Sequence, residues 1–140
     1  MRILILYYLI LFTTSFTGQS LKIDINWQGE ESYTIGKSSF VIPKSKNFKN
    51  NYSYRGYFKI VKQWEDKNLI DINSVKITNI RYSNINVDSY SGLEKMHFNR
   101  KPEIALKSST SKNKIFSFLE VAPIIYTNGN YKIVESFDVT

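Results

Sequence analysis

The stretch that decides the fold is SFLEVAPIIYTNGNYKIVESF, residues 117–137. Two apolar-rich runs flank Asn128-Gly129-Asn130, and Pro123 interrupts the first of them. Asn-Gly between two such runs is the strongest short-range signal for a β-hairpin, because both residues tolerate the positive φ angles of a tight turn. Proline cannot donate a hydrogen bond to a sheet, so Pro123 is expected at a strand end, with a bend before Ile124. The stretch therefore predicts a pair of neighbouring strands.

Alternation of apolar and polar residues extends this reading along the chain. Residues 21–27 (LKIDINW) and 131–139 (YKIVESFDV) alternate with the period of two that marks a half-buried strand. Shorter β-like runs are 33–35, 39–42, 57–64, 74–82, 104–107 and 114–121. For 57–64 a short helix is the alternative, but its β-branched and aromatic residues favour a strand. The apolar positions switch face between Ile77 and Ile80, which predicts a bulge or burial on both faces. About eight short strands with regular turn signals predict an all-β fold, an antiparallel β-sandwich or a partly open barrel.

Polar stretches between these runs predict the connections. We expect turns at residues 28–31 and 65–68 and exposed loops at 44–53 and 108–113, which are rich in turn-forming or charged residues. Residues 84–101 show the least regular pattern, and within them 93–98 predict one helical turn or a loop.

The N-terminus differs from the rest of the sequence. A basic start, Met1-Arg2, precedes the uncharged apolar run Ile3–Phe12 and the small polar residues up to Ser20. This order predicts a secretory signal peptide over 1–20, followed by a β module over 21–140. The run is shorter than the roughly 20 apolar residues that a membrane-spanning helix needs, although an uncleaved anchor is the alternative.

A basic and aromatic segment is the candidate binding site. Cations beside aromatic rings favour anionic ligands, and the formal net charge of the chain is +7. Export argues against nucleic acid, so an anionic polysaccharide or lipopolysaccharide is the expected partner. The alternative is a solvated loop beside a core strand. The basic residues are Lys44, Lys46, Lys49, Arg55 and Lys59, and they interleave with Phe48, Tyr52, Tyr54 and Tyr57.

Catalytic and metal-binding patterns are weak. The sequence contains no cysteine, which excludes a thiolate nucleophile and thiolate metal ligands from the chain. His97 is the one histidine, and we interpret it as a structural or surface residue. Gly36-Lys37-Ser38 lacks the first glycine of a phosphate-binding loop. Asp66 and Asp71 have the spacing to share a calcium ion, but solvated carboxylates are the simpler reading. We therefore expect no catalytic residues, no cofactor and no metal, while two remote carboxylates of a glycosidase stay open.

Several short strings together resemble the N-terminal region of the type IX secretion sortases, which are gingipain-like cysteine peptidases of the Bacteroidetes outer surface. The C-terminal strings are Ile104–Leu106, Lys112–Phe118, Ala122–Ile125, Gly129 and Lys132–Phe137. The upstream strings are Ile25–Trp27, Phe40–Pro43, Gln63-Trp64 and Val75–Asn79, the last of them before Tyr82. Each string is short, so the resemblance lies in their order and spacing.

This resemblance implies a role in processing exported cargo and attaching it to the cell surface. The family's cysteine endopeptidase domain and its immunoglobulin-like domain have no counterpart here, and His97 matches no catalytic position of the family. The chain is thus expected to be a non-catalytic, prodomain-like module, a fragment that stops where the peptidase domain would follow. Its expected partners are that missing domain or other secretion-system components, in the periplasm or at the outer-membrane surface. Alternatives are a free-standing secreted β-sandwich that binds glycan or lipopolysaccharide and, less favoured, an enzyme.

Overall fold

The computed structural model describes residues 20–52, 58–67 and 70–140. Within them the chain forms ten strands and two short 3-10 helices, so the all-β prediction is confirmed with more strands than expected. The strands are β1 (Leu21–Asp24), β2 (Trp27–Ile35), β3 (Ser38–Ser45), β4 (Lys49–Tyr52), β5 (Phe58–Asp66), β6 (Ile77–Asn84), β7 (Glu103–Ser111), β8 (Lys114–Ala122), β9 (Ile124–Thr127) and β10 (Asn130–Val139). The helices are η1 (Val87–Ser89) and η2 (Leu93–Lys95).

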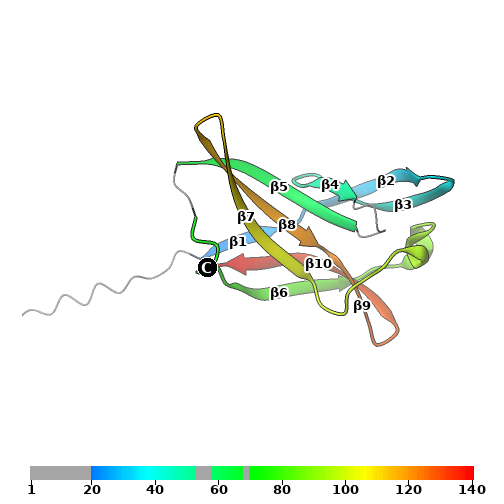
Figure 1. Ribbon diagram of the computed structural model, residues 1–140. Coiled ribbons are helices and arrows are strands. Elements are labelled where there is room, and N and C mark those ends of the chain that lie inside the picture. The colour runs from blue at the N-terminus through cyan, green and yellow to red at the C-terminus, as the bar shows by residue number, and fades with distance from the viewer. Residues whose placement is uncertain (1–19, 53–57, 68–69) are drawn as a thin grey trace, which may run out of the picture.

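Two antiparallel sheets form the main layers (Figure 1). The β10 sheet has the order β1-β10-β6, with β9 also paired to β10, and the β8 sheet has the order β4-β5-β8-β7. The hairpin β2–β3 forms a third, two-stranded sheet. Apolar side chains from all three sheets meet in one core. The sheets do not close into a barrel, so the arrangement matches the sandwich rather than the barrel alternative.

Pro123 carries the chain from one layer to the other. β8 ends at Ala122 in the β8 sheet, and β9 begins at Ile124 in the β10 sheet. Pro123 itself is fully buried, and its carbonyl accepts a hydrogen bond from the Val134 amide at 2.9 Å. The predicted bend is therefore confirmed. Within residues 117–137, however, only the part after Pro123 forms a strand pair, β9 with β10. The part before Pro123 belongs to β8, which lies in the opposite sheet.

The hairpin itself is β9–β10. Thr127 pairs with Asn130 across a two-residue turn. Asn128 and Gly129 both have positive φ, +52° and +77°, as the predicted type I′ turn requires. A second turn of this kind joins β7 to β8 at Lys112 (φ +49°) and Asn113 (φ +63°). These two residues belong to the predicted loop at 108–113.

β10 is the central strand of its sheet and has two partners along one edge. β9 pairs with its first half and β1 with its second half. Between them, the Trp27 indole Nε1 donates to the Val134 carbonyl at 2.8 Å, and the Ile25 amide donates to the Glu135 carbonyl at 2.8 Å. These bonds satisfy backbone groups that the two short partners leave unpaired.

Strand ends differ from the sequence-based predictions in three places. The predicted strand over 21–27 is divided, since β1 ends at Asp24 and β2 begins at Trp27. The predicted turn at 28–31 lies inside β2, where a bulge between Trp27 and Glu30 places Gly29 at φ +73°. The predicted loop at 44–53 contains the end of β3 and all of β4, which pairs with β5. Partner strands supply backbone hydrogen bonds to these polar residues, and side-chain patterning does not reveal such bonds.

Three further predictions concern β5 to β8. The predicted turn at 65–68 begins within β5, which extends to Asp66. The predicted loop at 108–113 is mostly β7, which extends to Ser111. The predicted irregularity of 74–82 is confirmed, because Asn79 has φ +51° and the register of β6 against β10 shifts nearby.

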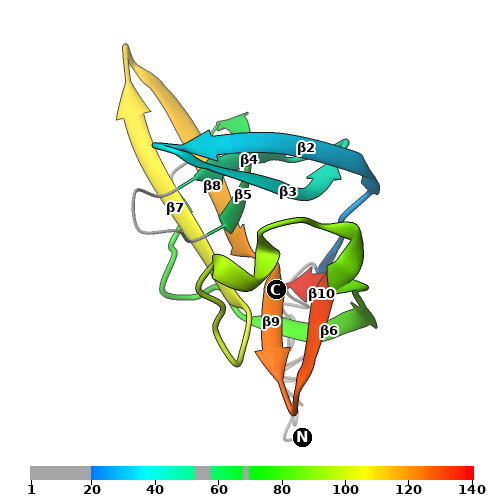
Figure 2. The same cartoon turned by 90° about the vertical axis from the view of Figure 1, so that its right-hand side faces the viewer.

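The segment between β6 and β7 lies between β3 and β9 (Figure 2). The predicted helical turn is η2, whose Leu93 is fully buried. The Val41 amide donates to the Ser91 carbonyl at 2.8 Å, and the Tyr126 amide donates to the Asn99 carbonyl at 3.1 Å. This segment therefore fastens the β2–β3 hairpin to the β9–β10 hairpin.

Gly92 gives a prediction about this fastening. Its φ is +83°, and a Cβ there would lie 2.9 Å from Phe40 Cδ1 and 3.1 Å from the Ser39 carbonyl oxygen. We expect Gly92→Ala to lower the free energy of unfolding by about 2–4 kcal/mol, from backbone strain plus overpacking. Gly129→Ala is the control, because φ is +77° but nothing lies within 4 Å, so about 1 kcal/mol is expected. Equal losses in urea denaturation would contradict the steric explanation.

The predicted signal peptide falls outside the described residues, apart from Ser20. Among the residues that the structure describes, no helix has the length and apolar character to cross a membrane.

Candidate functional site

The linker between β3 and β4, residues 46–48, is fixed against the junction of β1 and β2. The Asn47 side-chain amide donates to the Asp24 carbonyl at 2.7 Å, and Asn47 Oδ1 accepts from the Asn26 amide at 3.0 Å and from Ser45 Oγ at 2.8 Å. The Lys46 amide donates to the Asn26 carbonyl at 2.9 Å. An ordered linker holds the lysines on either side of it in defined places.

These lysines surround a groove beside β5, which we call the basic groove. It consists of a larger hollow of about 590 Å³ and an adjoining one of about 360 Å³. Both are lined by Lys46, Phe48 and Lys49. The larger hollow is also lined by Asn47, Val61, Lys62, Gln63, Trp64, Glu65 and Phe116, and the smaller one by Glu31, Lys44, Ser45 and Asn50.

Phe48 and Lys62 join the linker to β5. Phe48 is 5% exposed, and Lys62 Nζ lies 5.9 Å from the centroid of its ring. At this distance the ammonium group is attracted to the electron-rich face of the ring. Lys62 shares a face of β5 with Ile60 and Trp64, so it extends the apolar stripe of that strand into the groove.

The basic groove carries an excess of positive charge. Within residues 20–52, 58–67 and 70–140, no carboxylate lies within ion-pairing distance of Lys44, Lys46, Lys49 or Lys62. The two acidic residues that line the groove have other partners. Glu31 accepts a hydrogen bond from the Asn50 side-chain amide, and Glu65 pairs with Lys114 at 2.9 Å.

The structure brings three of the five predicted basic residues together. Lys44, Lys46 and Lys49 are all exposed and line the groove. Lys59 lies apart from it, 3.6 Å from Glu103. Arg55 lies outside the described residues, as do the predicted aromatic neighbours Tyr54 and Tyr57. Lys62, Trp64 and Phe116 belong to the groove but were not predicted, because they are close to it only through strand pairing.

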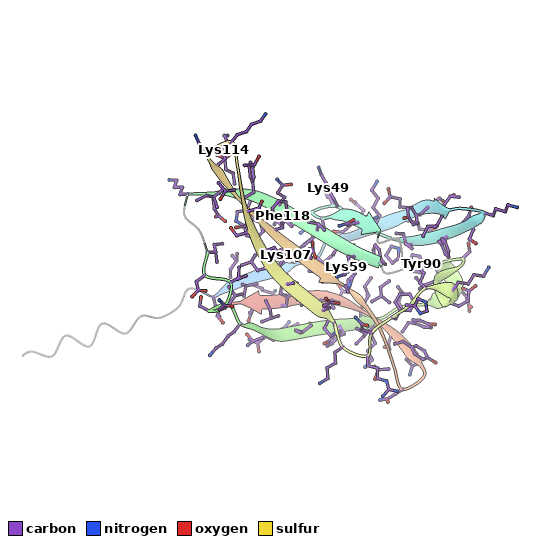
Figure 3. All side chains as sticks on the ribbon, in the orientation of Figure 1. Lys49, Lys59, Tyr90, Lys107, Lys114 and Phe118 are labelled. Atoms are coloured by element: carbon purple, nitrogen blue, oxygen red, sulfur yellow. The ribbon has the colours of Figure 1, made fainter. Side chains whose placement is uncertain are left out.

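The remaining lysines of the β8 sheet are neutralised. Lys107 lies beside Phe118, whereas Lys114 and Lys59 lie further along the sheet in opposite directions (Figure 3). Lys107 pairs with Glu120 at 2.7 Å, and Lys114 and Lys59 pair with glutamates as described above. This surface has nearly balanced charge, which distinguishes it from the basic groove.

Elsewhere the chemistry is sparse. His97 is exposed just after η2, and Gly36-Lys37 forms the turn between β2 and β3. The carboxylates considered for calcium have local partners, since Asp66 accepts from Ser117 Oγ and Asp71 Oδ1 accepts from the Asn73 amide at 3.0 Å. In the described part of the chain, no group of three or more histidine, aspartate or glutamate side chains could hold a metal ion.

Two tyrosines outside the groove, Tyr82 and Tyr90, have a raised pKa, and burial is the cause for Tyr82. Burial raises the pKa of Tyr90, and the negative charge of Glu30 raises it further. The hydroxyl of Tyr90 therefore stays protonated at neutral pH and can serve as a hydrogen-bond donor.

Comparison with protein-family models, with curated proteins and with solved structures found no match. The resemblance to the type IX secretion sortases thus remains a prediction from the sequence.

Proposed function

We propose that this protein is an exported, non-catalytic β-sandwich module that binds an anionic polymer through the basic groove. The observation that carries the proposal is a set of four lysines that line two adjoining hollows together with Phe48 and Trp64 and have no carboxylate partner among the described residues: Lys44, Lys46, Lys49 and Lys62. Anionic lipopolysaccharide or another acidic polysaccharide is the first ligand to test, in keeping with the predicted export.

The charge arrangement supports a polymer rather than a single small anion. An exposed lysine contributes on the order of 1 kcal/mol or less to one ion pair, so useful affinity needs several contacts along one ligand. The four lysines lie along two adjoining hollows, and the aromatic side chains offer apolar contact between the charges. A repeating polyanion satisfies several of them at once, and the flexible lysine side chains adapt to its spacing.

Salt dependence tests this proposal. We expect the purified protein to bind lipopolysaccharide and dextran sulfate at about 50 mM salt, and affinity to fall about tenfold or more at about 300 mM, because exposed charges are screened over roughly a Debye length. Neutral dextran is the control and should not bind. Fluorescence anisotropy with labelled polymer measures each affinity. Absence of binding at low salt, or binding indifferent to salt, would overturn the proposal.

A second candidate role is the N-terminal module of a sortase-like peptidase. The observation that favours it is that the C-terminal strings Ala122–Ile125 and Lys132–Phe137 contribute the buried residues Pro123, Ile133 and Phe137. Such a module would pack against the peptidase domain, assisting its folding or covering its cleft. If so, the DNA after codon 140 continues in frame, or after one frameshift, into a peptidase domain. An intergenic spacer followed by an unrelated gene would contradict this role.

A further inference from the structure

The edge of β5 beside the basic groove is only partly paired. On one side β5 pairs with β8 from Ile60 to Asp66. On the other side β4 pairs with Phe58–Val61 only, and among the described residues no strand continues along Lys62–Asp66. Figure 1 shows β4 beside one part of β5. An unpaired edge presents backbone N–H and C=O groups that a further strand can bond.

The reason for this open edge is the path of the linker. Before β4 begins, Lys46 and Asn47 donate and accept hydrogen bonds with Asp24 and Asn26, at the junction of β1 and β2. The linker is therefore held away from the β5 ladder. The larger hollow of the basic groove occupies this space and is lined by five consecutive β5 residues, Val61–Glu65. The unpaired stretch of five residues is roughly 17 Å long, enough for a short strand.

We propose that this edge is a docking site for an extended acidic peptide segment of a partner protein, which adds to the β8 sheet as a strand beside β5. This inference rests on the proposed function, because both use Lys46, Lys49 and Lys62. It goes further by specifying that the bound polymer is a polypeptide. A polysaccharide can meet the lysines, but it has no backbone that alternates N–H and C=O at strand spacing. Strand addition combines main-chain hydrogen bonds with side-chain pockets on both faces.

The positive charge beside this edge favours an acidic partner strand. Lysines on an edge strand oppose pairing with a second basic edge, so they disfavour self-association of this chain. An acidic strand instead meets Lys46, Lys49 and Lys62, none of which has a carboxylate partner in the described part of the chain. Apolar residues of the same strand can contact Trp64 or Phe116, the two half-buried aromatic side chains that line the hollow.

A set of synthetic peptides tests the mode of binding. The probe is an end-capped heptapeptide, Glu-Val-Glu-Thr-Glu-Val-Glu. It is compared with two derivatives, one N-methylated at the backbone amide of every glutamate and the other at the backbone amides of the remaining three residues. Alternate amides of a strand point to opposite edges, so strand addition requires one set only. We expect one derivative to bind like the parent and the other at least about tenfold more weakly. The matching lysine peptide should not bind.

Protein-side readouts complete the test. Peptide binding should slow hydrogen exchange at alternate amides within Lys62–Asp66, and the double variant Lys49→Glu/Lys62→Glu should weaken binding about tenfold or more. The double variant Lys37→Glu/Lys101→Glu, at exposed lysines outside the groove, is the control and should bind normally. Equal affinity for both methylated peptides would overturn strand addition. Binding of lipopolysaccharide without any peptide binding would overturn this inference and leave the proposed function standing, whereas binding of neither would overturn both.

Discussion

Phe137→Ala is expected to destabilise the protein by about 3–5 kcal/mol, the cost of a large cavity in a packed core. Phe137 is fully buried, and its strand pairs with Ile23 of β1 at this position. Its ring lies in the cluster to which both main sheets and the β2–β3 hairpin contribute. Because domains of this size are stable by only about 5–15 kcal/mol, the variant should be close to unfolding at 37 °C.

Urea denaturation followed by tryptophan fluorescence measures this loss, since Trp27 packs against the same core. Tyr82→Ala is the control. Tyr82 belongs to the same sheet but is 40% exposed, so its removal should cost about 1 kcal/mol or less. Similar losses of unfolding free energy in the two variants would contradict the central place of Phe137 in the core.

The triple variant Lys44→Glu/Lys46→Glu/Lys49→Glu is expected to lose at least about a hundredfold in affinity for lipopolysaccharide at low salt, because three attractions become repulsions of about 1 kcal/mol each. The three side chains are exposed, so the fold should tolerate the change. Anisotropy titration measures the affinity, and circular dichroism checks that the β-rich fold persists.

The control for this variant reverses the same amount of charge elsewhere. Lys37, Lys95 and Lys101 are exposed and line neither hollow of the groove. If binding depends on the groove, the affinity of Lys37→Glu/Lys95→Glu/Lys101→Glu should fall by no more than about tenfold, because only the net charge of the protein has changed. Equal loss in the two triple variants would show that net charge, rather than the groove, attracts the ligand.

Local turn chemistry and side-chain alternation predict part of this fold. Asn128-Gly129 and Pro123 act through their own backbone preferences, so the β9–β10 hairpin and the bend before it could be predicted. The turn at Lys112-Asn113 has the same geometry but lacks glycine, and serines and threonines hide the alternation of β7. β4 (KNNY) has little strand preference of its own and forms because β5 lies beside it.

The candidate site could be predicted only where its residues are close in sequence. Lys44, Lys46 and Lys49 come from one short segment, and the linker keeps them on one side of the molecule. Lys59 lies on the same face of the β4–β5 pair as Lys49, but it meets Glu103 of β7, a strand that is distant in sequence. Lys62 and Phe116 come together only when β5 pairs with β8, which composition does not reveal.

The pairing of β1 with β10 has a consequence for how the protein reaches its folded form. Leu21 lies opposite Val139, so the first and last strands that the structure describes are direct neighbours. Contacts between residues so distant along the chain form late and slowly. During synthesis the β10 sheet lacks its central strand until residues 130–139 have emerged. Until then β1 and β6 have no partner in this sheet, and their apolar side chains are open to binding by chaperones.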